Sequence, residues 1–289
     1  MAKKRLDQLL VERELAESHN LAQRLVIAGK VRVDGQLAVT PSQIVQDDAE
    51  LMVDSGPRFV SRGGEKLAAA LDAFSVDVQG LLCADAGAST GGFTDCLLQN
   101  GAAKVYAIDV GHGILDWKLR NDSRVVVMEK TNARHVEKLA EPVDLVVIDA
   151  SFISLKVLLP VVKGWFLPPS GSPHLTKMGG ETEGGNIIAL IKPQFEATRE
   201  EATLGKGVIR DTEIHKRVLH EILDFAISKG FSLRGLIRSP IQGPKGNVEF
   251  LVWLGLGIPP ADGKHSFRHR QVEAMIDAAF PHEEKNNRP

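Results

Sequence analysis

The first 54 residues contain short apolar stretches whose spacing changes from helical to strand-like along the chain. Ser18 is a suitable N-cap for a helix, and Gly29 suits the position just beyond that helix. Asp34-Gly35 is a hairpin turn signal between alternating apolar positions. Because a unit this small has a thin core, we expect residues 1–57 to form an appended α+β module. The predicted elements are helices at 6–10 and 20–28 and strands at 31–33, 37–39 and 51–53.

From residue 62 onward, almost purely apolar runs alternate with amphipathic segments. Such runs are typical of parallel strands buried on both faces of a sheet, and their alternation with helices indicates a doubly wound α/β domain. We therefore expect a Rossmann-like domain over residues 58–257 and a polar tail over 258–289 with one helix at 267–280. The predicted strands are 81–84, 104–108, 124–128, 145–148, 187–191, 231–239 and 248–254, and the predicted helices are 66–74, 92–99 and 211–229.

Three polar stretches interrupt this pattern. Residues 55–57, Ser-Gly-Pro, are expected to link the two domains. Residues 168–185 are rich in Pro, Gly, Ser and Thr and are long for a connection, which indicates a mobile loop or an insertion. Residues 283–289 are expected to be disordered.

The composition, 43% hydrophobic and 25% charged, is that of a globular protein. The net charge of −2 excludes a wholly basic nucleic-acid binder, yet residues 1–33 hold seven Lys or Arg against four Asp or Glu. Only Cys83 and Cys96 occur, both among apolar residues, which favours buried reduced thiols over a disulfide or a metal site. No apolar run is long enough to span a membrane, so we expect a cytoplasmic protein.

Four charged residues stand beside apolar runs in separate parts of the chain. Asp149 and Lys192 end two predicted strands, Glu249 interrupts the last predicted strand, and Lys66 lies at the start of a predicted helix. Charged groups at strand ends face the crevice where α/β sheets bind ligands. We therefore expect a reaction centre. The alternative is two structural ion pairs, which is disfavoured because buried ion pairs are poor stabilisers.

A glycine-rich segment at 85–94, Asp-Ala-Gly-Ala-Ser-Thr-Gly-Gly-Phe-Thr, follows the first predicted strand of this domain and opens a helix. Asp109 ends the next strand, where a carboxylate can accept hydrogen bonds from ribose hydroxyls. The spacing is not Gly-x-Gly-x-x-Gly, and Asp85 would suit a cationic amine and repel a pyrophosphate. The segment thus favours S-adenosylmethionine over NAD, and a generic glycine-rich turn is the alternative. Asn132 is expected to contact the adenine or to form a turn.

The chain resembles the TlyA (haemolysin A-like) family, in which an S4 RNA-binding module precedes an FtsJ-like ribose methyltransferase domain. The resemblance extends to about residue 256. Residues 18–35 resemble the S4 signature, 85–94 the S-adenosylmethionine motif and 109–113 the second motif of the family. Lys66, Asp149, Lys192 and Glu249 stand where the family carries a Lys-Asp-Lys-Glu tetrad. The segment 168–185 departs from the family pattern by its greater length.

The resemblance implies an S-adenosylmethionine-dependent methyltransferase acting on a ribose 2′-hydroxyl of cytidine in ribosomal RNA. The implied fold is a Rossmann-like methyltransferase sheet with a small N-terminal α+β S4 (alpha-L) domain. The implied partners are ribosomal RNA or ribosomal subunits, without a metal or a membrane; the oligomeric state is left open. The residues expected to bind the cofactor are Asp85, Gly87, Ser89, Thr90, Gly91, Gly92, Phe93, Thr94, Asp109, Val110, Asn132 and Asp149.

For the chemistry, Lys192 is the candidate base for the 2′-hydroxyl proton. A second lysine nearby, Lys66, and desolvation would both favour the neutral form of Lys192. Asp149 would then position Lys192 and help to orient the sulfonium methyl, and Glu249 would hold Lys66. Holding the hydroxyl and the methyl in line at ~3 Å would remove several kcal/mol of the barrier.

RNA binding is expected to rest mainly on phosphate contacts by basic residues, for which a solvated charged face is the alternative. Phe152 is expected to line the target pocket or to pack in the core, His112 to shape the cofactor loop, and Trp117 and Trp165 to lie in the core. Rival functions are a non-catalytic RNA-binding assembly factor, a Rossmann-type oxidoreductase and a membrane-active toxin. The residues expected to contact RNA are Lys3, Lys4, Arg5, Arg24, Lys30, Arg32 and Arg62, together with Arg58, Lys118 and Arg120.

Overall fold

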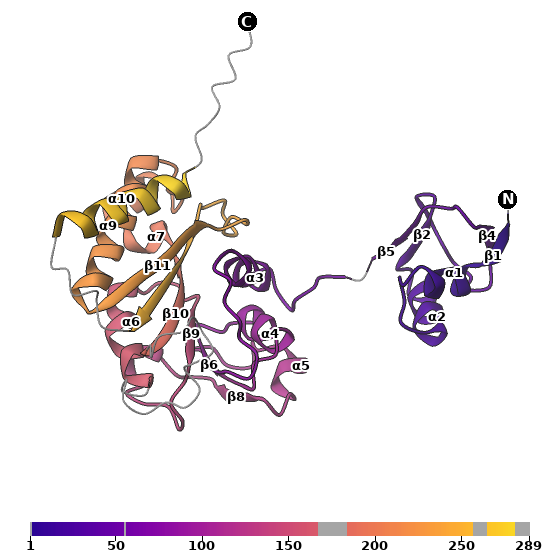
Figure 1. Cartoon of the computed structure of the whole chain (residues 1–289), viewed down its shortest axis with the longest axis horizontal. Helices are drawn as coiled ribbons and strands as arrows, with labels where there is room; N and C mark the ends of the chain where they lie inside the picture. Colours follow the sequence, from indigo (N-terminus) through magenta and orange to yellow (C-terminus); the bar gives the residue numbers. More distant parts are fainter. Residues whose placement is uncertain (1, 55, 167–183, 257–264, 281–289) are drawn as a thin grey trace, which may run out of the picture. The chain divides into compact units, whose positions relative to one another are not determined.

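The computed structural model describes residues 2–54, 56–166, 184–256 and 265–280. The chain divides into two compact units, Met1–Arg58 and Phe59–Pro289 (Figure 1). The segment expected to be a loop at 168–185 lies outside the described residues except for its last two positions, which begin a strand. The tail expected to be disordered at 283–289 also lies outside them.

The N-terminal unit contains two helices and two small antiparallel sheets. The strand orders are β3-β2-β5 and β1-β4. Ser18 caps the second helix by accepting a hydrogen bond from the Leu21 amide at 3.3 Å, and Gly29 takes the left-handed φ of +68° beyond the helix end. The elements are β1 (Lys3–Arg5), α1 (Leu6–Glu12), α2 (His19–Ile27), β2 (Val31–Val33), β3 (Gln36–Leu37), β4 (Ile44–Gln46) and β5 (Leu51–Val53).

The core of this unit is small, as expected, and joins the buried faces of both helices to the strands. Its largest contributors are Leu6, Leu9 and Leu10, each at most 2% exposed. Both predicted helices and the strands at 31–33 and 51–53 are confirmed. The strand predicted at 37–39 was wrong in its bounds, because β3 is only Gln36–Leu37. The strands β1 and β4 were not predicted, because β1 is the run Lys-Lys-Arg, without an apolar position, and β4, Ile-Val-Gln, does not alternate between apolar and polar residues.

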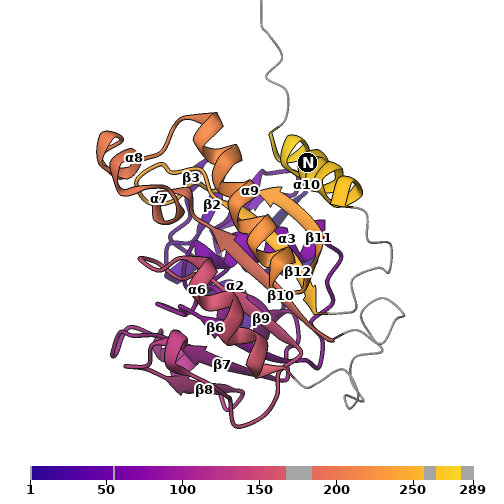
Figure 2. The ribbon, with the colours of Figure 1, turned by 90° about the vertical axis from the view of Figure 1, so that its left-hand side faces the viewer.

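The second unit is built on one seven-stranded sheet with the order β11-β12-β10-β9-β6-β7-β8 (Figure 2). The five strands from β10 to β8 are parallel, and β12 is antiparallel to both β10 and β11. The predicted doubly wound sheet is confirmed. The strands are β6 (Leu82–Ala86), β7 (Lys104–Ile108), β8 (Val125–Met128), β9 (Leu145–Ile148), β10 (Gly184–Ile191), β11 (Phe231–Arg238) and β12 (Phe250–Leu256).

Helices cover both faces of this sheet (Figure 1). Alternate residues of β9 show the two-sided burial: Val146 and Ile148 pack towards α6, α9 and α10, whereas Leu145 and Val147 pack towards α3 and α4. All four are fully buried, which explains why the strand reads as a continuous apolar run. The helices are α3 (Gly63–Ala73), α4 (Gly92–Gln99), α5 (Trp117–Arg120), α6 (Leu155–Val162), α7 (Pro193–Glu196), α8 (Arg199–Leu204), α9 (Thr212–Ser228) and α10 (His265–Ala279), with short 3₁₀ turns η1 (Ala133–His135) and η2 (Lys163–Trp165).

The sequence pattern did not reveal α5, α6, α7 or α8. Three of these have only four to six residues, and α6 contains Pro160, which normally argues against a helix interior. No helix in the described part of the chain is long and apolar enough to cross a membrane.

The direction of β12 determines which end of it reaches the ligand-binding edge. Because β12 runs antiparallel to β10, its first residue, Phe250, pairs with Ile191, the last residue of β10. Glu249 and Lys192, which flank these two residues, are therefore brought to the same edge of the sheet. This edge is also where the parallel strands β6 and β9 end, and it is the usual ligand-binding edge of an α/β sheet.

Candidate active site

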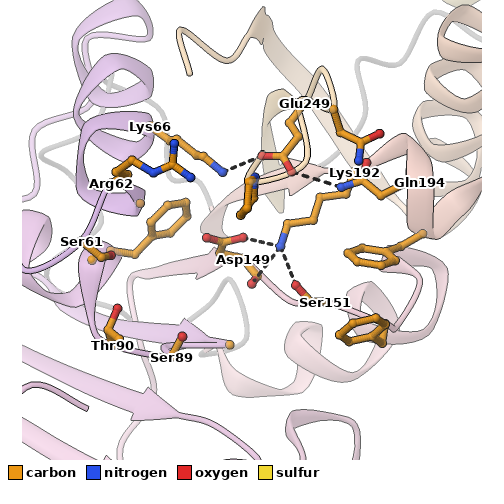
Figure 3. Close-up of a pocket in the computed structure, with 18 of the residues that line it drawn as sticks. Ser61, Arg62, Lys66, Ser89, Thr90, Asp149, Ser151, Lys192, Gln194 and Glu249 are labelled. Carbon is orange, nitrogen blue, oxygen red and sulfur yellow. Dashed lines mark hydrogen bonds and ion pairs between the residues drawn. The ribbon is translucent and has the colours of Figure 1, made fainter. Parts of the chain in front are cut away.

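Two adjoining cavities lie at the carboxyl edge of the parallel strands. The larger, of about 540 Å³, contains all four charged residues singled out from the sequence, and we call it the tetrad cavity (Figure 3). The smaller, of about 470 Å³, lies beside the glycine-rich loop, and we call it the loop cavity. The residues that line both cavities are Gly87, Ser89, Asp149, Ser151 and Phe152.

Lys192 lines the tetrad cavity beside Asp149 and Ser151, which line both cavities, and three oxygen atoms surround its ammonium group. The Nζ atom is 2.6 Å from Asp149 Oδ1 and donates hydrogen bonds to Ser151 Oγ at 2.9 Å and to the Asp149 carbonyl at 3.4 Å (Figure 3). The Lys192 side chain is 9% exposed. The amine is thus held on one side by acceptors that come directly after β9, while its own backbone follows β10.

Lys66 and Glu249 form the second ion pair of the cavity. Lys66 Nζ donates to Glu249 Oε2 at 2.5 Å, and the two side chains are 8% and 2% exposed. The other carboxylate oxygen, Oε1, accepts a hydrogen bond from Gln194 Nε2 at 3.2 Å. The tetrad therefore consists of two ion pairs in one cavity, and Gln194 links the second pair to the segment that follows Lys192.

The glycine-rich loop between β6 and α4 is held in an unusual backbone conformation. Gly87, Ser89 and Gly91 all have positive φ values, of 94°, 51° and 99°. A Cβ on Gly87 would lie 2.9 Å from the Asp149 carbonyl oxygen, so the loop crosses directly over the end of β9. Asp109, after β7, accepts hydrogen bonds from the amides of Ser89 and Gly111 at 2.9 and 2.7 Å. The loop is therefore a fixed cradle rather than a flexible linker.

Asp85 lies beneath this cradle, contrary to the expectation that it faces a ligand amine. It is 0% exposed and lines neither cavity, and its Oδ2 accepts from the backbone amide and the hydroxyl of Thr94 at 2.9 and 2.7 Å. The cause is the two-residue period of β6, which turns Asp85 towards α4 on the same face as Cys83. Burial raises the pKa of Asp85 to about 7. Asp85 therefore supports the loop from below.

The other residues expected to bind a cofactor divide between the two cavities. Asp109, Val110 and Asn132 line the loop cavity, and Asn132 Oδ1 also accepts from the Arg134 amide at 3.2 Å, so it forms a turn as well. Thr94 and Gly91 line neither cavity, because Thr94 is fully buried and Gly91 is the N-cap of α4. The residues of this set that line the tetrad cavity without lining the loop cavity are Thr90, Gly92 and Phe93.

An aromatic pair stands at the junction of the two cavities. Phe152 has a φ of 63° and is 90% exposed, and its ring centroid lies 4.8 Å from that of Phe195. The core-packing alternative for Phe152 is therefore excluded. Phe195, Ser151, Gln194 and Asn247 were not predicted to belong to the site; the apolar–polar pattern contains no signal for them beyond their closeness to Asp149, Lys192 and Glu249.

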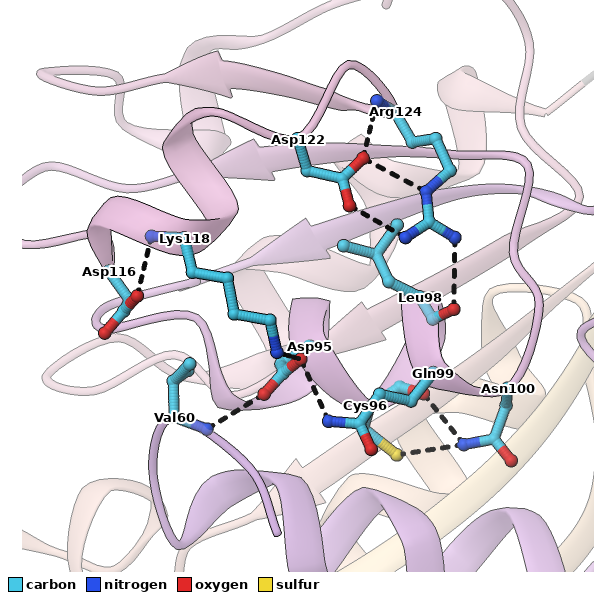
Figure 4. Close-up of polar contacts among 10 residues, drawn as sticks. All are labelled: Val60, Asp95, Cys96, Leu98, Gln99, Asn100, Asp116, Lys118, Asp122 and Arg124. Carbon is cyan, nitrogen blue, oxygen red and sulfur yellow. Dashed lines mark hydrogen bonds and ion pairs between the residues drawn. The ribbon is translucent and has the colours of Figure 1, made fainter. Parts of the chain in front are cut away.

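The start of α3, which carries Lys66, is anchored to α4. Asp95, 2% exposed, accepts from the Val60 amide at 2.9 Å, from Gln99 at 3.0 Å and from Lys118 Nζ at 3.1 Å (Figure 4). The segment between Arg58 and α3 is thereby fixed against the helix that follows the glycine-rich loop. Arg62, one of the residues expected to contact RNA, lines the tetrad cavity.

Among the basic residues expected to contact RNA, many are already engaged within the protein. Lys4 Nζ is 2.6 Å from Glu12 and 3.1 Å from Asp47. Arg5 pairs with Asp7 at 2.8 Å, and Arg120 pairs with Glu129. Within the described ranges, Lys3, Arg24 and Lys30 form no ion pair, so they are the better candidates for phosphate contacts.

The remaining sequence expectations divide as follows. Trp165 is in the core at 1% exposure, but Trp117 is 76% exposed, so placing it in the core was wrong. α5 is a four-residue helix with only Leu119 buried, and its aromatic residue faces outward.

His112, in the loop after β7, lines neither cavity, and its Nδ1 lies 3.1 Å from Glu129 Oε2. Cys83 and Cys96 are buried and form no disulfide. The described residues include no group of three or more His, Cys, Asp or Glu placed to hold a metal ion.

Comparison with known proteins bears on both units. Residues 4–51 match the S4 domain, and residues 59–256 match the FtsJ-like methyltransferase family. The 16S/23S rRNA (cytidine-2′-O)-methyltransferase TlyA of Mycobacterium tuberculosis is 45% identical over 254 residues, which cover 86% of this chain and 89% of that protein. Hemolysin A of Brachyspira hyodysenteriae is 39% identical over 253 residues, covering 86% and 98%.

A solved structure from Streptococcus thermophilus, which also bears a hemolysin name, has a TM-score of 0.63 and 40% identity and covers 97% of this chain and 98% of that one. The family match runs from residue 59 to the end of β12, so it spans the seven-stranded sheet and includes all four tetrad residues. The chain therefore belongs to the FtsJ-like methyltransferase family, in the TlyA group that carries an N-terminal S4 domain.

Proposed function

We propose that this protein transfers a methyl group from S-adenosylmethionine to the 2′-hydroxyl of a cytidine in ribosomal RNA. The observation that carries the proposal is the Lys192–Asp149 ion pair at the junction of the tetrad and loop cavities. A group bound in one cavity and a nucleoside bound in the other would meet at this pair. The name of the Mycobacterium tuberculosis relative supports the choice of substrate.

The loop cavity has the chemistry that S-adenosylmethionine requires. The carboxylates of Asp109 and Asp149 line it, and they favour a cationic ligand over a pyrophosphate. Asp109 retains acceptor capacity for ribose hydroxyls beside its two amide hydrogen bonds. Val110 and Asn132 supply an apolar and a polar wall for the base. When bound, S-adenosylmethionine supplies an electrophilic methyl group on a sulfonium.

Lys192 acts as the base that accepts the 2′-hydroxyl proton at Nζ. To do so it must direct a lone pair at the hydroxyl, so one of its three present contacts has to give way. The contact with the Asp149 carbonyl, at 3.4 Å, is the longest of the three. The Asp149 carboxylate and the Ser151 hydroxyl then keep the amine in place during the proton transfer.

Lys66 and Glu249 contribute by holding charged groups at fixed places in the cavity. Glu249 fixes the Lys66 ammonium through the 2.5 Å ion pair, and this places a second positive charge in the cavity that contains Lys192. Holding the hydroxyl in line with the methyl group contributes the rest of the acceleration.

The S4 unit supplies RNA affinity in this scheme. Lys3, Arg24 and Lys30 are among its cations that form no ion pair within the described residues, and cations of this kind bind phosphates with strong salt dependence. A target nucleotide must also leave its helix to reach a cavity of this depth, as in other enzymes that modify nucleotides.

The test is direct methylation. Purified protein is incubated with labelled S-adenosylmethionine and separate 30S and 50S subunits from a strain that lacks the enzyme, and 2′-O-methyl sites are mapped. Label at one or two cytidines, absent with Lys192→Ala, would support the proposal. Absence of label on either subunit, with cofactor binding confirmed, would instead favour another RNA or a non-catalytic assembly factor.

A further inference from the structure

One wall of the tetrad cavity is built from two segments that are distant in the sequence. The first, residues 205–210, joins α8 to α9, and the second, residues 239–248, joins β11 to β12. Gly207, Pro244, Lys245 and Asn247 from these segments line the cavity together with Glu249. Neither segment belongs to a helix or a strand, so specific contacts have to hold this wall in place.

The side-chain amide of Asn247 joins the two segments. Its Oδ1 accepts from the Ile209 amide at 3.0 Å, and its Nδ2 donates to the Gly207 carbonyl at 2.9 Å. Asn247 is only 4% exposed. A carboxamide is suited to this position because it presents one acceptor and one donor side by side, which neither a carboxylate nor a hydroxyl of the same reach can do.

The first segment needs such support because its backbone is strained. Lys206 and Gly207 are both left-handed, with φ values of 51° and 81°, and a non-glycine residue in that region costs on the order of 1 kcal/mol or more. A second side chain supports the same segment from the other side, because Nε2 of His215 lies 3.1 Å from the Ile209 carbonyl oxygen. The His215 ring is 3% exposed and packs against the rings of Phe250 and Phe280, whose centroids lie 5.9 and 6.4 Å from its own.

The second segment is equally constrained, and it leads directly into Glu249. The Asn247 carbonyl accepts from the Gly243 amide at 2.9 Å, and the Glu249 carbonyl accepts from Ser239 at 2.8 Å. A Cβ on Gly243 would lie 2.6 Å from Glu249 Oε1, so the turn lies directly against the carboxylate. Asn247 therefore fixes the cavity wall and the turn that supports Glu249 at once.

We infer that Asn247 is a positioning residue for the RNA acceptor, because it holds segment 205–210 as the wall of the tetrad cavity against which the target nucleoside is placed. The inference rests on the proposed function, since it assigns the acceptor to this cavity. Asn247 lines the tetrad cavity but not the loop cavity. Its loss should therefore affect the use of RNA and not the binding of S-adenosylmethionine.

The experiment compares Asn247→Asp with the wild-type protein. The change keeps the shape of the side chain, removes the donor to Gly207 and sets a carboxylate oxygen against that carbonyl. Leaving buried polar groups unpaired in this way corresponds to about a tenfold effect or more, so we expect the KM for RNA to rise about tenfold. We expect kcat to change less than KM and the Kd for S-adenosylmethionine to stay within about twofold.

Asn186→Asp is the matched control. Asn186 is also a buried asparagine, 1% exposed, and its Oδ1 accepts from Trp253 Nε1 at 2.9 Å. It pairs with Leu145 at the start of β9, at the opposite edge of the sheet from the cavities, and lines neither of them. An equal rise in KM for both variants would overturn the inference, as would an unchanged KM for Asn247→Asp. Asn247→Ala serves as the second variant if the aspartate prevents folding.

Hydrogen exchange separates this inference from the proposed function. The amide of Ile209 should exchange faster in Asn247→Ala, which removes its hydrogen-bond acceptor, than in the wild-type protein, whatever the substrate. If the wild-type protein methylates no RNA but Ile209 loses its protection in the variant, the proposed function fails and the structural role of Asn247 stands. If Ile209 keeps its protection, the inference is overturned even where methylation is observed.

Discussion

Lys66 and Glu249, 183 positions apart in the sequence, form an ion pair of 2.5 Å that is almost entirely shielded from water. Removing one partner of such a pair leaves an uncompensated buried charge and typically costs about 3–5 kcal/mol, whereas neutralising both costs far less. We therefore expect Lys66→Met and Glu249→Gln each to lower the free energy of unfolding by several kcal/mol. The double variant should be more stable than either single variant.

Urea unfolding of the three variants and the wild-type protein measures this coupling. Single substitutions that each cost less than about 1 kcal/mol would show that water reaches the pair and that it behaves as a surface ion pair. All three variants should lose methylation, since each removes a charge from the cavity.

Lys192→Ala should abolish methylation, because it removes the proposed base. The Kd for RNA should stay nearly unchanged, since the S4 unit is untouched, and the protein should still bind S-adenosylmethionine. Single-turnover methylation and filter binding measure the two properties separately. Ser151→Ala is the companion variant: it removes the 2.9 Å contact of Lys192 but leaves the ion pair with Asp149, so it should retain part of the rate. Normal methylation by Lys192→Ala would remove Lys192 from the mechanism.

Asp85 should make stability depend on pH. Burial raises its pKa to about 7, so the folded chain binds the Asp85 proton more tightly than the unfolded chain does. The resulting stabilisation is fully present below the unfolded-state pKa of about 4 and is lost as the pH rises to about 7. The loss is on the order of a few kcal/mol.

Asp85→Asn should remove this pH dependence while keeping the acceptor for Thr94. Thermal unfolding at pH 5 and pH 8 gives the comparison: the melting temperature of the wild-type protein should fall more than that of the variant. Parallel pH profiles for the two proteins would mean that Asp85 is ionised in the folded state throughout this range.

Gly87→Ala should weaken binding of S-adenosylmethionine. The new Cβ would lie 2.9 Å from the Asp149 carbonyl oxygen, at a residue whose φ is +94°. The loop would have to move away from β9, and the loop cavity would change shape. Gly80→Ala is the control, because Gly80 also has a positive φ, of +76°, and nothing lies within 4 Å of its Cβ position. Calorimetric titration should show weaker binding for Gly87→Ala alone; equal losses for both variants would point to backbone strain in general.

Lys3 and Lys4 are neighbouring lysines, and a comparison of the two tests which basic residues of this unit contact RNA. Lys4 is paired with Glu12 and Asp47, whereas Lys3 forms no ion pair within the part of the chain that is described. Loss of one phosphate contact lowers the slope of log K against log salt by roughly 1. We expect Lys3→Ala to show this change and Lys4→Ala to show less of it. The reverse order would mean that Lys4 exchanges its carboxylates for phosphate when RNA binds.

The main strands of the sheet were predictable from the sequence wherever the pattern of apolar and polar residues was clear. β7 and β9 were predicted to the residue, because continuous apolar runs of four or five residues end abruptly at Asp109 and Asp149. The same logic brought Asp149 and Lys192 to one edge, since strand ends in a parallel sheet share that edge. Glu249 reaches this edge because β12 runs antiparallel to β10 and begins there. β1 and α7 were not predicted, because Lys-Lys-Arg contains no apolar position and Pro-Gln-Phe-Glu contains a single aromatic one between polar residues.

Side-chain partners could not be predicted in the same way. The sequence indicated that four charges meet, but not that Ser151 and Gln194 would complete their hydrogen bonds. Asp85 was placed in the ligand site on the basis of its position in the glycine-rich motif. The prediction did not consider which face of β6 the side chain would take, and that face is turned towards α4. Trp117 was wrongly placed in the core, because the prediction relied on residue type alone. The helix that carries it, α5, has only four residues and buries Leu119 instead.

The reversed direction of β12 has a consequence for how the protein becomes active during synthesis. β12 is inserted between β10 and β11 and brings Glu249 to a lysine made near the beginning of the domain. Until that strand is in place, a partly translated chain can already possess the glycine-rich loop, Asp149 and Lys192. Ribosomes stalled before β12 would therefore carry nascent chains that contain three of the four tetrad residues and lack Glu249. Glu249 is thus the last of these four residues that the growing chain acquires.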